Sequence, residues 1–313
     1  MNKLTEIKIF SGRSHRGLAE EICQKLHIKL SLTKVQEYAN GCFEIILQDE
    51  LKGRKVFLIQ TSVPQTLHRD FWELLQMVNA AKKNGAKEII VVMPYVSYAR
   101  SDKIYAPGMA ISAELLIRIL KESGIARFIG IDFHSKEFEK FLLELNIKGY
   151  HLSALPLIAE CLKTKRIGDG IMLPGDEGAL DKTVLLAKKL GLPVGVAKKK
   201  RIDDKTVIIE DIVGEVSEKD IIVLDDEISV GTTIGTLGKK LEELSAKSLT
   251  VAVTHGLFVG KAIENLKSLK ILREIVVTDS LPISSEVEKS LSVRVLSVAG
   301  LIAEKIKEIS NEF

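Results

Sequence analysis

The sequence predicts an α/β protein with two similar domains, in each of which helices cover both faces of a mainly parallel sheet. Short apolar runs of buried-strand type alternate with amphipathic helical patterns along the chain. This alternation begins again near the middle of the sequence, which indicates a duplicated architecture. Aromatic residues make up only 5% of the chain, so the core must consist mainly of Ile, Leu, Val and Ala, as is typical of such sheets.

The first domain is expected to span residues 1–149. Ser14 is the candidate N-cap of its first helix, because a serine hydroxyl can accept a hydrogen bond from a free amide of the first helical turn. In chain order, we expect strands at 7–10, 42–47, 55–60, 88–93 and 128–133, and helices at 14–26, 69–84 and 112–123.

The second domain is expected to span residues 150–313. No Pro/Gly/Ser-rich linker precedes it, so we expect the two domains to pack tightly and share a site. We expect strands at 170–173, 194–198, 221–224, 249–254, 274–278 and 293–297, an extended arm at 207–212, and helices at 155–162, 179–190, 234–244, 261–266 and 301–309.

Composition excludes several classes of protein. Lys+Arg 45 against Asp+Glu 42 gives a net charge of +3, and no basic and aromatic stripe indicates nucleic-acid binding. No apolar window is long enough for a membrane span. Cys23, Cys42 and Cys161 are odd in number and lack metal-type spacing, which favours reduced thiols. We therefore expect a cytoplasmic protein that binds neither nucleic acid nor membrane.

One strand end carries two adjacent acids and a hydroxyl-rich turn. Asp225 and Asp226 follow the apolar run 221–224, and Ser229, Thr232 and Thr233 precede the next expected helix. The free amides and the dipole of a helix N-terminus form a site for phosphate, and the hydroxyls can donate to its oxygens. The two acids would then serve sugar hydroxyls or Mg²⁺. The competing interpretation is an acidic surface turn without a ligand.

Four other strand ends also carry polar side chains. His134 follows the strand 128–133, Asp176 lies in a glycine-rich turn, Lys199 and Arg201 lie in a basic run, and Arg100 follows another strand. Each has an ordinary structural explanation when taken alone. Ligands of open α/β sheets bind outside the carboxyl ends of the strands, where these residues would lie together. Together they supply a pair of ligands for a divalent metal and cations for a polyphosphate.

These motifs resemble a known family over nearly the full chain. Segment 223–233 resembles the phosphoribosyl-diphosphate loop of the phosphoribosyltransferase fold, with Ser229 and Val230 where an acid and a threonine are common. The order of the motifs is similar to that of the ribose-phosphate diphosphokinases. The matching residues are Pro94-Tyr95, Tyr98-Ala99-Arg100, Asp102, Asp132-Phe133-His134, Asp176, Gly178, Lys199, Arg201, Thr254-His255-Gly256-Leu257-Phe258 and Thr278-Asp279-Ser280-Leu281-Pro282.

The resemblance implies two phosphoribosyltransferase-like domains and an enzyme that transfers the β,γ-diphosphate of ATP to the 1-hydroxyl of ribose 5-phosphate, with Mg²⁺ as cofactor. It also implies a water-excluding lid near residues 202–205. The implied residues are Lys199 and Arg201 for catalysis, His134 and Asp176 for the metal, Tyr38, Asn40, Cys42, Arg100, Ser101, Asp102 and His134 for ATP, and Asp225, Asp226, Ser229, Val230, Gly231, Thr232 and Thr233 for ribose 5-phosphate.

The loop 38–42 departs from the family pattern Phe-x-Asp-Gly-Glu, because Asn40 and Cys42 replace its two acids; Ser101 stands where the family commonly has glutamine. In the family this loop reaches an adenine across a subunit interface, which implies a homo-oligomer with a shared nucleotide site. A simple hairpin turn with Asn40-Gly41 is the alternative for this loop. For the whole chain, the alternatives are a catalytically weak regulatory paralogue of a synthetase and a phosphoribosyltransferase.

Overall fold

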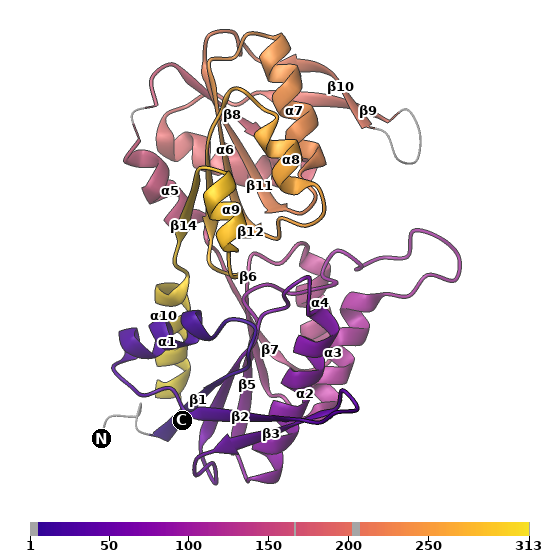
Figure 1. The fold of residues 1–313 in the computed structure, drawn as a ribbon, viewed down its shortest axis with the longest axis vertical. Coiled ribbons are helices and arrows are strands. Elements are labelled where there is room, and N and C mark those ends of the chain that lie inside the picture. Colours follow the sequence, from indigo (N-terminus) through magenta and orange to yellow (C-terminus); the bar gives the residue numbers. More distant parts are fainter. Residues whose placement is uncertain (1–5, 166, 202–206, 313) are drawn as a thin grey trace. The chain divides into compact units, whose positions relative to one another are not determined.

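The computed structural model describes residues 6–165, 167–201 and 207–312, without the side chains of 199–201, 207 and 208. It consists of two compact units (Figure 1). Unit 1 comprises Met1–Ser153, Ser280–Pro282 and Ser297–Phe313, and unit 2 comprises Ala154–Asp279 and Ile283–Leu296. The C-terminal segment therefore belongs to unit 1, whereas the division at 149/150 stays a prediction about domains.

Unit 1 contains a parallel sheet of five strands in the order β1-β4-β5-β6-β7. Its central strands are buried at every position after the first, as expected when helices cover both faces. An antiparallel hairpin, β2-β3, accompanies it. The bounds are β1 Ile7–Ser11, β2 Leu32–Glu37, β3 Phe43–Gln48, β4 Lys55–Ile59, β5 Glu88–Val92, β6 Arg127–Ile131 and β7 Lys148–Leu152.

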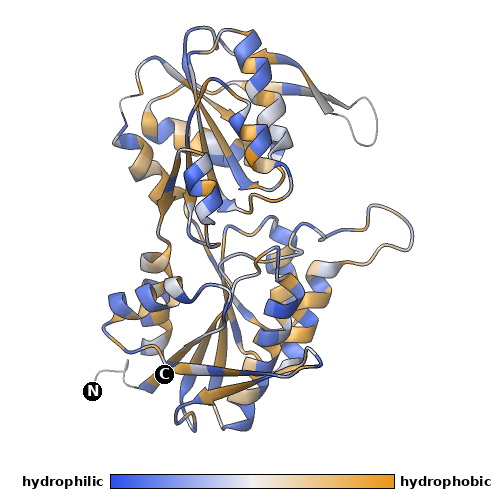
Figure 2. Cartoon of the chain, viewed as in Figure 1, coloured by the Kyte–Doolittle hydropathy of each residue, from blue (hydrophilic) through white to orange (hydrophobic). Residues whose placement is uncertain are grey.

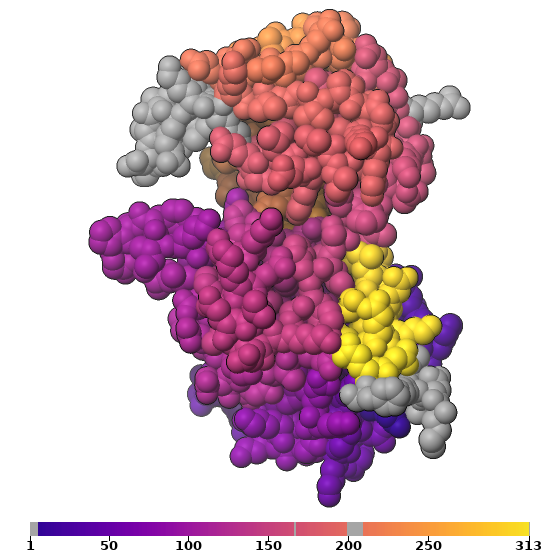
Figure 3. Space-filling view, turned by 180° about the vertical axis from the view of Figure 1, so that it is seen from behind, coloured from indigo at the N-terminus to yellow at the C-terminus, as the bar shows by residue number. Residues whose placement is uncertain are grey.

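Helices cover both faces of this sheet (Figure 1). Helices α2 (Leu67–Lys83), α3 (Ser112–Ser123) and α4 (Lys136–Glu144) contribute to one hydrophobic core. The other face carries α1 (Arg16–Leu26) and α10 (Ala299–Asn311), which contact each other. Figure 3 shows α10 in yellow against the N-terminal part of the chain.

Unit 2 repeats the chain order of unit 1. Its parallel sheet has the order β14-β13-β12-β11-β8, and its hairpin, β9-β10, again lies in sequence between the first and second sheet strands. This repetition confirms the predicted fold class of two similar α/β parts. The bounds are β8 Gly170–Pro174, β9 Val196–Arg201, β10 Val207–Val213, β11 Asp220–Ile228, β12 Ser248–Gly256, β13 Leu272–Thr278 and β14 Val293–Leu296.

The helices of unit 2 also form two layers. Helices α5 (Leu155–Lys163) and α6 (Leu180–Leu190) pack on one face of the sheet. Helices α7 (Thr232–Glu243), α8 (Ala262–Lys267) and α9 (Ser285–Ser290) pack on the other. In both units the sheet strands are mainly hydrophobic, whereas hydrophilic and hydrophobic residues alternate along the helices (Figure 2), as expected for helices that pack on a sheet with one face. No helix in the described ranges is both long enough and apolar enough to span a bilayer.

Two details of the sequence prediction are wrong. Ser14 does not cap α1, whose N-cap position is His15, because its hydroxyl donates to Gln60 Oε1 at 2.5 Å and accepts from Thr61 N at 3.0 Å. Strand β11 continues through Asp225 to Ile228, since its pairing with β12 extends to Gly256. The prediction also omitted β2, α4, β7 and α9.

Candidate active site

Three carboxylates lie together at the carboxyl end of the unit 2 sheet. Asp225 and Asp226 belong to β11, and Asp176 follows β8. Because β8 and β11 pair in parallel up to Pro174 and Leu224, the residues that follow them are neighbours. One ligand oxygen from each of the three aspartates lies within 4.8 Å of the others. The residues alone left sugar hydroxyls or Mg²⁺ open for Asp225 and Asp226, and the resemblance gave them to the sugar and Asp176 to the metal. The sequence did not predict that the three side chains approach one another, which depends on the strand pairing.

Local hydrogen bonds fix two of these carboxylates. Asp176 Oδ1 accepts from Ala179 N at 3.0 Å and so caps the short 3-10 turn that follows. Asp225 Oδ1 accepts from Asp226 N at 2.8 Å. These bonds hold the acidic side chains at defined positions.

Gly175 makes room for Asp225. A Cβ atom at this position would lie 2.2 Å from Asp225 Oδ2, a separation that no side chain can accept. The Gly175 amide also donates to Leu224 O at 2.7 Å. Any side chain at this position would therefore have to displace the Asp225 carboxylate.

The cluster favours a bound cation. Burial raises the pKa of Asp225 to about 8, and the charges of Asp226 and Asp176 add to the effect. A divalent cation with oxygen ligands would remove this repulsion, and carboxylates are the ligands that such hard cations prefer. The three residues therefore fit a divalent metal ion.

A turn and a helix N-terminus follow the acidic strand. Gly231 precedes α7 with a φ of 74°, a left-handed conformation that favours glycine. Thr232 and Thr233, the first two residues of α7, are exposed. The amides of the first helical turn lack acceptors within the helix and carry the positive end of its dipole. This geometry suits a phosphate group.

The turn between β11 and α7 is fixed by hydrogen bonds from the segment before α8 and from α8 itself. Val259 N donates to Ser229 O at 3.0 Å, and Asn265 Nδ2 donates to Val230 O at 2.9 Å. The Val230 side chain is 39% exposed and has no hydrogen-bond donor. Side-chain hydroxyls at this turn therefore come from Ser229 and the two threonines.

Lys199 and Arg201 lie on β9, opposite Ile209 and Val207 of β10. Their side chains and the expected lid at 202–205 lie outside the described residues. Their catalytic roles stay predictions.

The predicted adenine loop is a tight hairpin turn between β2 and β3 in unit 1. Tyr38 N donates to Cys42 O at 2.9 Å, and Gly41 has a φ of 84°. Asn40 Oδ1 accepts from Cys42 N at 3.0 Å. The Tyr38 hydroxyl donates to Glu44 Oε2 at 2.8 Å, and the side chain of Tyr38 is 41% exposed. The loop is thus a hairpin turn with an exposed tyrosine ring, and its role in nucleotide binding stays a prediction.

The other predicted nucleotide residues of unit 1 follow β5. Arg100 is exposed, whereas Asp102 is only 5% exposed. Ser101 O accepts from Ala113 N at 3.1 Å, which ties the segment to the first turn of α3. The structure therefore presents Arg100 to solvent and anchors the two residues after it.

His134 is exposed at the end of β6. The turn before it is held in place by Phe133 N, which donates to His151 Nε2 at 3.1 Å, and by Ser153 Oγ, which donates to Asp132 Oδ1 at 3.2 Å. Asp132 has a φ of 40°. His134 belongs to unit 1 and Asp176 to unit 2, so their predicted pairing on one metal stays a prediction.

Comparison with known proteins identifies the family. The family model described as the N-terminal domain of ribose phosphate pyrophosphokinase matches residues 7–124, and the phosphoribosyl synthetase-associated domain matches residues 176–313. The ribose-phosphate pyrophosphokinase of Agrobacterium fabrum is 33% identical over 98% of this chain and 97% of its own, and that of Bacillus caldolyticus is 34% identical over 97% and 95%.

A solved structure agrees with these matches. The phosphoribosylpyrophosphate synthetase of Mycobacterium smegmatis superposes with a TM-score of 0.89 at 28% identity, covering 97% of this chain and 98% of that one. Sequence and structure are thus matched over nearly their whole length. The chain belongs to the ribose-phosphate pyrophosphokinase family.

Proposed function

We propose that the protein is an active ribose-phosphate pyrophosphokinase (ribose-phosphate diphosphokinase) that converts ATP and ribose 5-phosphate to phosphoribosyl diphosphate and AMP. The observation that carries this proposal is the succession of the acidic strand β11, a turn and helix α7, in a chain that matches the family along nearly its full length. There, partly buried acids near the end of β11 are followed by a turn and a helix N-terminus that suit a phosphate group.

In this reaction the 1-hydroxyl oxygen of the sugar attacks the β-phosphorus of ATP. The bond from that phosphorus to the oxygen of the α-phosphate breaks, AMP leaves, and the hydroxyl proton passes to solvent. The protein has mainly to align the reactants and neutralise charge. Lys199 and Arg201 would stabilise charge on the transferred diphosphate as the leaving bond breaks.

The acidic strand and the turn after it suit ribose 5-phosphate. The Asp225 and Asp226 carboxylates accept hydrogen bonds from sugar hydroxyls, which have protons to donate. The 5-phosphate would lie at the N-terminus of α7, within reach of the hydroxyls of Ser229, Thr232 and Thr233. The amides around Val230 and Gly231 add donors to this site.

Mg²⁺ is the proposed cofactor. When bound, it neutralises phosphate charge and orients the diphosphate. His134 and Asp176 would hold it, and the approach of Asp225 and Asp226 to Asp176 supports a cation at this edge of the sheet.

ATP would be bound mainly by unit 1, through Tyr38 stacking on the adenine and through the residues of two surface segments. These residues are Asn40, Cys42, Arg100, Ser101, Asp102 and His134. We propose a cytoplasmic homo-oligomer in which the hairpin turn reaches a neighbouring subunit's nucleotide. A monomer in light scattering at assay concentration would contradict this arrangement.

The test incubates purified protein with ribose 5-phosphate, Mg²⁺ and ATP and follows AMP and phosphoribosyl diphosphate. Stoichiometric formation of both products is expected. A regulatory paralogue would bind ATP but would release AMP much more slowly than an active synthetase does. A phosphoribosyltransferase would instead consume phosphoribosyl diphosphate when a base is supplied. Either of these results would refute the proposal.

A further inference from the structure

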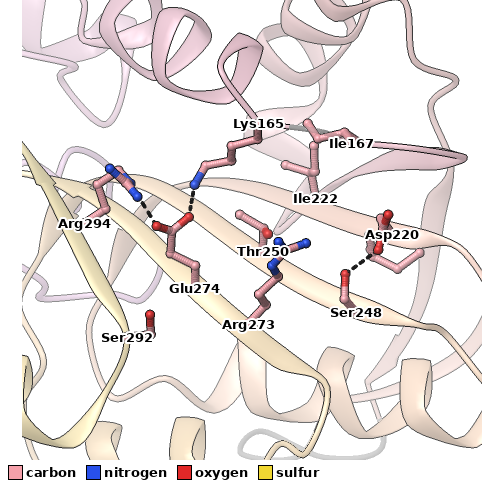
Figure 4. A pocket seen from close by; sticks show the side chains of 11 residues that line it. Lys165, Ile167, Asp220, Ile222, Ser248, Thr250, Arg273, Glu274, Ser292 and Arg294 are labelled. Atoms are coloured by element: carbon pink, nitrogen blue, oxygen red, sulfur yellow. Dashed lines mark hydrogen bonds and ion pairs between the residues drawn. The ribbon is translucent and has the colours of Figure 1, made fainter.

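Unit 2 contains a cavity of about 300 Å³ that the proposed reaction does not use. It is lined by charged and hydroxyl side chains together with three aliphatic residues (Figure 4). Its volume is at the lower end of the range for small-molecule sites. The lining residues are Lys165, Ile167, Asp220, Ile221, Ile222, Ser248, Thr250, Arg273, Glu274, Ser292 and Arg294.

The cavity lies at the amino-terminal edge of the sheet. Asp220 and Ser248 are the first residues of β11 and β12, and Glu274 and Arg294 lie near the beginning of β13 and β14. The carboxylates of the candidate active site lie at the other end of the same strands. On β11, Asp225 lies five residues (roughly 16 Å) beyond Asp220 and three residues (roughly 10 Å) beyond Ile222, so a ligand held at the amino-terminal edge is separate from a ligand at the acidic cluster.

Most charges of the lining are already paired. Glu274 forms an ion pair with Lys165 and accepts from Arg294 Nε at 2.8 Å. Asp220 accepts from Ser248 Oγ at 2.7 Å and lies 3.6 Å from Lys247 Nζ. Arg273 forms no hydrogen bond or ion pair with the residues that the structure describes. It extends into the cavity beside Thr250 (Figure 4).

The lining therefore contains one more cationic side chain than acidic ones. Its three cations, Lys165, Arg273 and Arg294, face two acids, Asp220 and Glu274. Burial lowers the pKa of Lys165 in spite of its pair with Glu274, and repulsion from Arg294 and Arg273 adds to this effect. The hydroxyls of Thr250 and Ser292 also face the cavity and can donate. The complementary ligand is a small anion.

The corresponding edge of unit 1 shows how such cations are satisfied within this fold. Arg127, the first residue of β6, forms ion pairs with Glu88 and Glu312. Lys148, the first residue of β7, lies 3.2 Å from Glu312 Oε1. Lys55 Nζ donates to the Glu312 carbonyl at 2.8 Å. A carboxylate from a distant segment therefore occupies that edge, whereas no described segment brings an acid to Arg273.

We propose that this cavity binds a small organic anion through a carboxylate or phosphate group paired with Arg273. The planar guanidinium presents two parallel N–H groups to two oxygens of such a group. Thr250 and Ser292 can donate to the free lone pairs of these oxygens, or to a further oxygen if the group is a phosphate. This proposal does not depend on the proposed function, because none of these residues belongs to the acidic cluster or to the turn before α7.

The experiment measures hydrogen exchange in residues 248–250, 272–275 and 292–294 of the full chain. It titrates two probes separately: malonate as a carboxylate and methyl phosphate as a phosphate ester. At least one probe should slow exchange in these segments, and the more effective one identifies the preferred head group. Arg273→Gln should weaken binding by roughly 10- to 100-fold, because a charge-assisted hydrogen-bond pair is lost.

Lys270→Gln is the matched control, since it removes an exposed cation three residues earlier that does not line the cavity. It should bind the better probe like the parent. Should Arg273→Gln fail to fold, Arg273→Lys decides the question: a lysine cannot form the two-pronged pair and should weaken binding about tenfold. No protection of the parent by either probe, or equal protection in the parent and the folded Arg273 variants, would overturn the proposal.

Discussion

Replacing Asp225 by asparagine should make the metal-free protein more stable. Asparagine has nearly the same shape and keeps an oxygen that can accept from Asp226 N, the bond that measures 2.8 Å in the structure. It removes the charge that burial and the neighbouring acids oppose. The site therefore carries electrostatic strain that a bound cation relieves.

The size of the effect follows from the pKa. The pKa of Asp225 rises from 3.8 to about 8 on folding, and 1.4 kcal/mol for each pH unit gives an upper bound of roughly 6 kcal/mol. Interacting carboxylates titrate as a group, so the effect of removing one of them is smaller and we expect about 2 to 3 kcal/mol. Between these two pKa values the folded protein holds a proton that the unfolded chain has lost. Stability of the parent therefore falls as the pH rises through this window.

Urea unfolding in EDTA across this pH range measures the prediction. The advantage of Asp225→Asn should vanish near about pH 4 and be largest at about pH 8. Saturating Mg²⁺ should reverse the order, because a cation beside the three carboxylates stabilises the charged Asp225, which only the parent contains. Asp220→Asn on the same strand is the control. The hydrogen bond from Ser248 lowers the pKa of Asp220. Loss of the Asp220 charge should therefore destabilise the protein at neutral pH and have less effect in acid. An Asp225→Asn protein less stable than the parent at alkaline pH without metal would refute the reasoning.

Lys199→Ala should lower kcat at least about 100-fold, on the order of 3 kcal/mol, with little change in Km, whereas Lys198→Ala stays within several-fold; equal losses would reduce the basic run to a phosphate-attracting patch. Asp226→Ala should weaken the binding of ribose 5-phosphate by roughly 1 to 3 kcal/mol, measured as a higher Km for this substrate. An equal rise of the Km for ATP would contradict the sugar assignment. Gly175→Ala should cost about 1 to 3 kcal/mol in urea unfolding, because its methyl group displaces the carboxylate behind it; unchanged stability would show that the turn yields freely.

Periodicity was sufficient to predict the sheet strands that are buried on both faces. Strand β5 and helix α3 were predicted within one residue, because an apolar run or an amphipathic stripe defines each of them. Strand β2 was missed because it is an edge strand with mostly exposed side chains and no continuous apolar run. Ser14 failed as a cap because its hydroxyl oxygen accepts from the amide of a distant residue, Thr61, instead of from a helix amide.

The sequence predicted motifs that gather at the carboxyl ends of the strands, but not which of their side chains lie next to one another. Asp225 and Asp226 were recognised from the turn that follows them, since that turn is local in sequence. The approach of Asp176 depends on the pairing of β8 with β11, two strands separated by several elements. No local pattern encodes such a pairing. Arg273 likewise becomes conspicuous only after the partners of its neighbours are known.

The return of the chain into unit 1 has a consequence for synthesis on the ribosome. Helix α10, which packs against α1, follows the residues of unit 2, so roughly 140 residues separate the two parts of unit 1. About 270 residues separate α1 from α10, so at about 5 to 20 residues per second a nascent chain would display the uncovered apolar surface of α1 for roughly 15 to 55 seconds. Unit 2 does not include α10, so its folding is not delayed until that helix has been made. In a cell, the segment made first would therefore finish folding last, and chaperones would have their longest opportunity to bind at the surface that α10 later covers.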